Sequence, residues 1–136
     1  MKVQLAAVAL CVASLSAHAA DLSVSLQGVS SQQGRLMVAL YASEDAYKKK
    51  EPLQARALPA NGVRDTVFKD LAPGRYAIAV FHDENGNGKL DRDGAGLPLE
   101  AYGFSRNPGT RYGPPGFADA AVSLDKESQA LSITLE

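Results

Sequence analysis

Residues 71–81 read LAPGRYAIAVF and join a tight turn to an alternating extended segment. Pro73 and Gly74 favour the turn, because proline presets the backbone of one turn position and glycine accepts positive φ at another. Beyond the turn, apolar side chains alternate between the two faces of an extended chain: Tyr76, Ile78 and Val80 on one face, and Ala77, Ala79 and Phe81 on the other. A period of two is that of a β-strand, so this stretch predicts a strand entered from a turn.

Other parts of the chain show extended segments of the same kind. Further strands are expected at residues 22–26, 36–40, 63–68, 117–124 and 131–135. We expect Asn61-Gly62 to form a hairpin turn, because both residues tolerate positive φ. The polar turn at residues 125–128 is expected to join the last two segments into a final hairpin.

Residues 43–50 are predicted to form one helical turn. Ser43 is a typical cap, acidic residues come first, three lysines come last and Pro52 follows. The lysine run therefore has a structural explanation, and a binding patch is the alternative. Some seven strands with short turns and a single helical turn predict one all-β domain, an antiparallel β-sandwich, and argue against an α/β fold.

The first 19 residues have the form of a secretory signal peptide. Lys2 provides the positive charge, residues 5–15 are apolar, and Ala17-His18-Ala19 offers small residues at the cleavage positions. A membrane anchor is the alternative, but the apolar stretch would rise only about 16 Å as a helix, roughly half of a bilayer core. We therefore expect residues 20–136 to be the mature domain, periplasmic or secreted, with no membrane span after cleavage.

The cysteine count and the charge exclude several classes of function. The chain of 136 residues has 14 Lys+Arg against 15 Asp+Glu, so a phosphate-tracking surface has no evident source and nucleic acid is an unexpected partner. Its single cysteine, Cys11, lies in the signal segment, which excludes disulfides, thiol catalysis and cysteine zinc sites from the mature domain. Lipidation of Cys11 is an alternative to cleavage after Ala19, but the bulky Leu10 before the thiol argues against it.

Residues 83–116 interrupt the strand pattern with a long loop that holds eight of the 12 glycines and four of the seven prolines. Ordering a loop backbone costs about 1–2 kcal/mol per residue. Its few large apolar side chains return only about 1.5–3 kcal/mol each when fully buried. Apolar burial alone is therefore not expected to hold the loop.

The start of this loop resembles a calcium-binding loop of the D-x-[DN]-x-[DN]-G type. Its candidate ligands are oxygen donors at alternate positions, namely the side chains of Asp83, Asn85, Asn87 and Asp91 and the carbonyl of Lys89. Gly88 allows the sharp turn that such a loop needs. Gly94 stands where a bidentate glutamate is usual, so Asp93 or Glu100 would complete the shell. The affinity is then expected in the weak range, about 10⁻⁴ to 10⁻³ M.

A turn without any ion is the alternative, because Asn-Gly-Asn-Gly is also good turn chemistry. Between residues 83 and 100, five acidic residues face only Lys89 and Arg92, which favours a hard cation, with calcium as the hypothesis. His82 is interpreted as a strand-end residue or a donor to a ligand, since a hard cation prefers oxygen.

Aromatic residues follow in the second half of the loop. Tyr102, Phe104 and Tyr112 would form a surface that stacks on a sugar ring or a partner peptide. The alternative, which we favour, is that these rings fold back as a lid over a sheet edge.

Three motifs together resemble the bacterial family called domain of unknown function 2141. They are HDENGNGKLD at 82–91, GLPLEAYGFS at 96–105 and PPGF at 114–117. The resemblance implies an exported protein with an immunoglobulin-like or transthyretin-like sandwich, and no established activity. The strand and acidic loop also resemble, more weakly, the calcium-binding B-type repeats of bacterial adhesins.

Catalysis has less support than binding. Ser105, His82 and Asp119 include the residue types of a triad, but no nucleophile elbow surrounds Ser105. Glu100 and Asp93 are the candidate carboxylate pair of a small hydrolase. We therefore expect a non-catalytic protein that binds one structural calcium ion through residues 83–93 and presents residues 94–116 to an unknown cell-envelope protein or glycan. A carbohydrate- or peptidoglycan-recognition module is the alternative.

Overall fold

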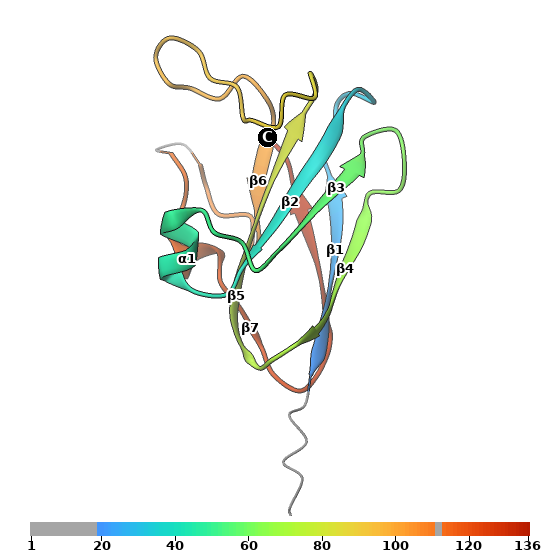
Figure 1. Ribbon diagram of the computed structural model, residues 1–136, viewed down its shortest axis with the longest axis vertical. Coiled ribbons are helices and arrows are strands. Elements are labelled where there is room, and N and C mark those ends of the chain that lie inside the picture. The colour runs from blue at the N-terminus through green and yellow to red at the C-terminus, as the bar shows by residue number, and fades with distance from the viewer. Residues whose placement is uncertain (1–18, 111–112) are drawn as a thin grey trace, which may run out of the picture.

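The computed structural model describes residues 19–110 and 113–136 and shows two packed β-sheets with two short helices (Figure 1). The all-β sandwich expected from the alternation is confirmed. The expected signal peptide, 1–19, lies almost wholly outside the described residues. In chain order the elements are β1 (Ala20–Gln27), β2 (Arg35–Tyr41), α1 (Glu44–Lys49), β3 (Gln54–Pro59), β4 (Asp65–Leu71), β5 (Gly74–Asp83), β6 (Tyr102–Phe104), α2 (Phe117–Ala120), β7 (Val122–Leu124) and β8 (Gln129–Thr134).

The larger sheet has five strands, built around the β5 strand that the alternating segment predicts. Its order is β3-β2-β5-β6, and all pairs are antiparallel. The additional strand β7 pairs with the first residues of β5, and β6 pairs with the middle of β5. Between these two short strands lies Ser105, whose backbone N–H donates to the Ile78 carbonyl at 2.9 Å. β6 and β7 therefore form an interrupted edge, and β6 is a strand within the long loop that the alternation did not predict.

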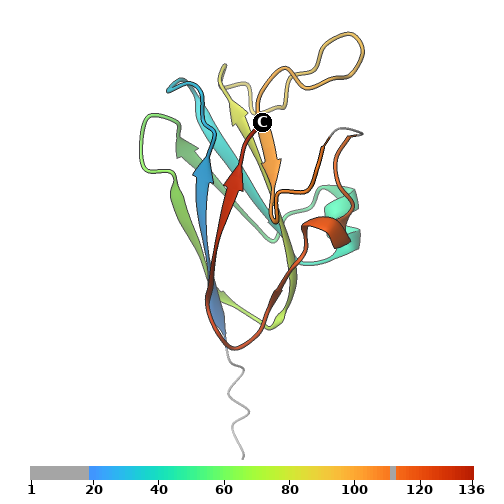
Figure 2. The ribbon, with the colours of Figure 1, turned by 180° about the vertical axis from the view of Figure 1, so that it is seen from behind.

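The smaller sheet has three strands in the order β4-β1-β8 (Figure 2). β1 and β4 are antiparallel, whereas β1 and β8 run parallel, with Leu22 opposite Gln129 and Gln27 opposite Thr134. The sandwich is thus antiparallel except for this one pair.

The core lies between the two sheets and is filled by the inward residues of the alternating strands. Leu22, Leu36, Phe68, Ile78 and Ile133 are completely buried. Each belongs to a strand whose period-two pattern places every second side chain on the inner face.

One side of the sandwich is closed by contacts between β6 and the end of the chain. The Tyr102 N–H donates to the Glu136 carbonyl at 3.2 Å, and the Glu136 N–H donates to the Tyr102 carbonyl at 3.0 Å. Gly103 allows this approach, since a Cβ at that position would lie 2.7 Å from the Thr134 carbonyl oxygen. We call this contact the β6–β8 seam.

The helical turn predicted at 43–50 is confirmed as α1, which Ser43 caps by accepting a hydrogen bond from the Ala46 N–H at 3.1 Å. The strand expected at 117–124 is wrong in its first half. Residues Phe117–Ala120 form α2, because prolines and Gly116 precede them and because Phe117 and Ala120, three residues apart, bury one helical face against Ala77. No helix among the described residues is long and apolar enough to cross a membrane.

Both expected hairpins are also wrong. The strand after Asn61-Gly62 begins at Asp65, and β3 and β4 belong to different sheets. Ala60 is completely buried and its N–H donates to the Gly34 carbonyl, so the chain turns inward there and crosses between the sheets. β7 and β8 likewise join different sheets, because β7 pairs with β5 and β8 pairs with β1.

Candidate functional site

The acidic loop starts at the end of β5, where Asp83 is 2% exposed. Its carboxylate accepts hydrogen bonds from the Gly88 N–H at 2.8 Å and from the Asn87 N–H at 3.2 Å. Gly34 lets the chain pass close by, because its φ is +72° and a Cβ there would lie 2.0 Å from the Asp83 carbonyl oxygen. The first candidate ligand is therefore fixed by the strand before it and by two backbone donors after it.

Two asparagines and Asp91 meet at the middle of the loop. The Asn85 and Asn87 side-chain amides donate to the two carboxylate oxygens of Asp91, at 2.5 and 2.6 Å. Their Oδ1 atoms accept backbone N–H groups, from Asn87 at 3.2 Å and from Lys89 at 2.9 Å. The hydrogen bonds from Asn87 and Asn85 hold the pKa of Asp91 below its usual value, with a smaller contribution from Lys89.

Glu100 reaches the same loop from further along the chain. Its two carboxylate oxygens accept the N–H groups of Glu84 at 2.8 Å and of Asp91 at 3.0 Å. A β-bridge between Arg92 and Pro98 folds the chain back and brings Glu100 there. Glu100 therefore ties the two ends of the acidic loop together, on the side of the loop that Gly94 leaves without a carboxylate.

Asp93 does not join this group. Its Oδ1 atom accepts the N–H groups of Ala95 and Leu97, both at 2.9 Å, and so organises a separate turn. Glu100 and Asp93 were the two residues expected to replace the twelfth ligand. In the structure Glu100 bonds to the acidic loop, whereas Asp93 stabilises the turn at residues 95–97.

The donors that converge are a mixed set of carboxylates and amides. Within residues 19–110 and 113–136, no three side chains of His, Cys, Asp or Glu lie close enough together to hold a metal. Any cation bound here would depend on the amide oxygens of Asn85 and Asn87 beside the carboxylates of Asp83 and Asp91. Oxygen donors of this kind suit calcium, and an amide oxygen with two lone pairs can accept an N–H while it coordinates an ion.

His82 lies in the core directly before the loop and is completely buried. Its Nε2 lies 2.6 Å from the Gln33 carbonyl oxygen, and because a carbonyl only accepts, this nitrogen carries the proton. Nδ1 is without a hydrogen-bond partner among the described residues, and Glu84 Oε1 is 3.8 Å away. His82 thus links β5 to the turn before β2, as expected for a strand-end residue.

The aromatic candidates lie in a strand rather than in a free loop. Tyr102 and Phe104 belong to β6, are half-buried on the outer face of the five-stranded sheet, and stack edge to face with centroids 6.0 Å apart. Tyr112 lies outside the described residues.

A groove of about 660 Å³ crosses this outer face. Tyr47 and Lys48 border it on the side of α1, and Lys89 and Leu90 border it on the side of the acidic loop. Figure 1 shows α1 and the loop after β5 at these two ends of the sheet. Two cross-strand rows form the floor: Met37, Phe81 and Tyr102 in one row, and Ala55, Ala39, Ala79 and Phe104 in the other.

Most of the groove residues were not identified as functional from the sequence. The available signal was the apolar character of the second face of residues 36–40 and 76–82, where a sandwich strand usually carries polar side chains. That signal indicates an unusual outer face, but which residues lie side by side in the rows depends on the pairing register of the four strands.

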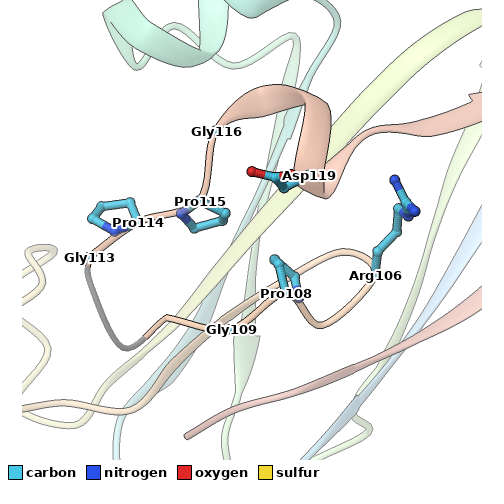
Figure 3. A pocket seen from close by; sticks show the side chains of 8 residues that line it. All are labelled: Arg106, Pro108, Gly109, Gly113, Pro114, Pro115, Gly116 and Asp119. Atoms are coloured by element: carbon cyan, nitrogen blue, oxygen red, sulfur yellow. The ribbon is translucent and has the colours of Figure 1, made fainter.

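Figure 3 shows a second hollow, of about 510 Å³, between residues 106–109 and 113–119. Glycine and proline line most of it, and its charged side chains, Arg106 and Asp119, are of opposite sign. The hollow borders residues 111–112, which lie outside the described part of the chain, so we place no site there.

Of the residues considered for catalysis, Asp119 is exposed and lines the second hollow, whereas Ser105, Asp93 and Glu100 bond to the backbone. Ser105 is completely buried; its Oγ accepts the Ile78 N–H at 2.9 Å and donates to the Ala120 carbonyl. Asp93 and Glu100 each accept two backbone N–H groups, in two different turns.

Residues 24–132 match a family described as "Uncharacterized protein conserved in bacteria (DUF2141)". This range covers most of both sheets and the acidic loop. No curated protein and no solved structure matches the chain.

Proposed function

We propose a function for this chain, which belongs to the bacterial family DUF2141. It is an exported, non-catalytic sandwich protein whose acidic loop binds one calcium ion. The ion would fix the start of the long segment between β5 and α2. We propose that residues 94–116 of this segment are presented to a partner in the cell envelope.

The observation that carries the proposal is the arrangement around Asp91. Two amide groups, from Asn85 and Asn87, face its two carboxylate oxygens, and the Asp83 carboxylate holds the next turn of the same loop. A divalent ion would take the place of the two amide donors and would draw in the Asn85 and Asn87 oxygens. Glu100, already bonded to both ends of the loop, supplies the extra carboxylate that Gly94 cannot.

The proposal that the protein is non-catalytic is supported by the hydrogen bonds that two of the candidate catalytic side chains make to the backbone. Ser105 is buried in the sheet edge, and His82 Nε2 faces a backbone carbonyl. Neither atom is available to a substrate without a rearrangement of the core.

The carbohydrate alternative is not taken forward. Tyr102 and Phe104 are half-exposed, but the floor beside them consists of phenylalanine, alanine and methionine side chains, which offer no hydrogen bonds to sugar hydroxyls.

A melting curve of the purified protein with calcium or with chelator tests the calcium site. At a free concentration of about a hundred times the dissociation constant, binding adds about 2.7 kcal/mol to the free energy of unfolding. For a domain of this size, that corresponds to a rise in Tm of roughly 8–15 °C. Magnesium at the same concentration is expected to give a much smaller rise.

Two variants make the test specific. Asp83→Asn removes a proposed ligand and should abolish the calcium-dependent rise, whereas Asp93→Asn changes an acid of the same loop that serves another turn and should retain it. A Tm that calcium leaves unchanged, or a rise that is equal in both variants, would refute the proposed site.

A further inference from the structure

The outer face of the five-stranded sheet is apolar where it meets water. The side chains of Met37, Ala39, Ala79 and Phe81 are all partly exposed, and Ala55 is exposed. Large apolar faces that remain uncovered on a folded domain usually mark a binding surface. The groove described above is the concave part of this face, and its volume is in the range of small-molecule sites, about 300–1,000 Å³.

The groove has the shape of a trough that runs across the strands. Ala55, Ala39 and Ala79 form a row of methyl groups. This low row lies between two higher ridges, one made by Met37, Phe81 and Tyr102 and the other by the stacked rings of Tyr41 and Tyr47, whose centroids are 5.4 Å apart. Three strands at a spacing of about 4.8 Å make the alanine row about 10 Å long, with Phe104 of β6 at its end, and this shape suits an extended, unbranched chain.

The charges around the trough are of one sign. Arg56 lines it but bonds to Gln54 and lies over the Phe68 ring. Lys48, Lys50, Lys89 and Arg92 also line it, and no Asp or Glu does so among the described residues. Lys48 is paired with Glu44 at 2.9 Å, but no carboxylate of the described residues lies within salt-bridge distance of the other three. Three cations without an acidic partner therefore border an apolar channel.

We propose that this trough binds a fatty acid, with the acyl chain along the alanine row and the carboxylate at the cationic rim. A neutral sugar would find no hydrogen-bonding floor, and a cationic ligand would be repelled by the rim. The inference goes beyond the proposed function and does not depend on a calcium ion, because the floor comes from β2, β3, β5 and β6.

Binding of laurate to the whole protein, measured by calorimetry below its micelle concentration, tests the proposal. Dodecyl maltoside has an acyl-like chain of the same length and a neutral head, and dodecyltrimethylammonium has a cationic head. Laurate is expected to bind at least tenfold more tightly than either. The methyl resonances of Ala39, Ala55 and Ala79 are expected to shift on addition of laurate, whereas that of Ala130, on the other sheet, should not.

Variants locate the site. Ala79→Leu fills the trough and should weaken laurate binding at least tenfold, while the matched Ser25→Leu, on the outer face of the three-stranded sheet, should leave it unchanged. Lys50→Glu should weaken laurate binding severalfold without affecting dodecyl maltoside, and Lys69→Glu, on β4, is its control. If Ala79→Leu fails to fold, the alanine methyl shifts of the unmodified protein decide.

Three results would overturn the proposal. Equal binding of all three amphiphiles would show an unspecific apolar face, and laurate shifts at Ala130 in place of Ala39 would place the ligand elsewhere. Absence of laurate binding would also refute it, and concentration-dependent dimerisation abolished by Ala79→Leu would then identify a second copy of the chain as the occupant.

Discussion

The two outer faces of the sandwich both belong to strands that pack against the same core but carry opposite chemistry. The outward positions of the three-stranded sheet are largely polar, with Ser23, Ser25 and Ser132 among them, and no described helix covers them (Figure 2). The five-stranded sheet carries alanine, methionine and aromatic residues outward, and α1 and α2 pack against one end of it. Polar side chains on an outer face are hydrated by water, whereas exposed apolar side chains are stabilised when another part of the protein or a ligand covers them. The helices supply that cover over one part, and the groove is the part they leave.

The largest effect is expected when a helix side chain that covers the five-stranded sheet is removed. Phe117 of α2 is 8% exposed, packs against Ala77 and lies 6.1 Å from the Tyr47 ring. Phe117→Ala is expected to lower the free energy of unfolding by about 3 kcal/mol, near the lower end for a buried phenylalanine. Urea denaturation measures the loss.

Val67→Ala is the control for that change, because Val67 is 37% exposed on β4 of the other sheet. Its cost should stay below about 1 kcal/mol. If both substitutions lower the free energy of unfolding equally, α2 does not stabilise the protein by covering the five-stranded sheet.

A second comparison uses serine, which is present on both sheets in different roles. Ser105 joins Ile78 and Ala120 at the interrupted edge of the five-stranded sheet, and both partners are completely buried. Ser105→Ala leaves a buried N–H and a buried carbonyl without partners and should cost about 2 kcal/mol. Ser25→Ala, on a half-exposed serine of β1, should change the free energy of unfolding by less than about 0.5 kcal/mol. Equal effects in thermal or urea unfolding would contradict the role of Ser105 at that edge.

The smallest expected effect is the contribution of Tyr47, at the end of the sheet that the helices cover, to the dependence of stability on alkaline pH. Burial raises the pKa of Tyr47 above 10.0, and the charges of Tyr41 and Asp119 add to this shift. The Tyr47 hydroxyl also donates to the Pro115 carbonyl at 2.7 Å, which requires the neutral phenol. The unfolded chain ionises first, so stability is full below pH 10 and falls as the pH rises toward the folded pKa.

Tyr47→Phe should reduce the slope of stability against pH above 10.0, while costing about 1 kcal/mol at neutral pH for the lost hydrogen bond. Urea titrations between neutral pH and about pH 11 measure both quantities. An unchanged slope in Tyr47→Phe would show that this phenol ionises over the same pH range in the folded and unfolded chains, which would contradict its raised pKa.

The strands were predictable because their signal is local. Alternation at β1, β2, β5 and β8 depends only on which side chains must face the core, and the helical turn at Ser43 depends only on its cap. Pairing is not local, which is why Asn61-Gly62 failed as a hairpin: the burial of Ala60 decides the direction of the chain there. Residues 117–120 also have no distinctive local period, and the contact of Phe117 with Ala77 settles them as a helix.

The acidic loop also has one part that the sequence predicts and another part that depends on contacts formed only in the fold. The spacing of Asp83, Asn85, Asn87 and Asp91 could be read from the sequence because the loop is one continuous turn. The choice of Glu100 over Asp93 needed the bridge between Arg92 and Pro98, which no spacing rule contains. The alanine row of the groove depends on the pairing registers of β3 with β2 and of β2 with β5, and alternation alone could show only that the outer face was apolar.

The β6–β8 seam has a consequence for how the protein behaves at high concentration. Because β6 and the last residue of the chain are hydrogen-bonded to each other on that side, part of one edge of each sheet is paired, and β3 and β4 form the opposite edges of the two sheets. Such edges are the usual templates for fibril growth, and here each carries a deterrent: β3 ends in Pro59, and β4 presents Asp65, Lys69 and Asp70, the last with φ at 56°. The seam and these features of β3 and β4 thus reduce the unpaired backbone that the sheet edges offer to neighbouring chains, while the apolar face stays open.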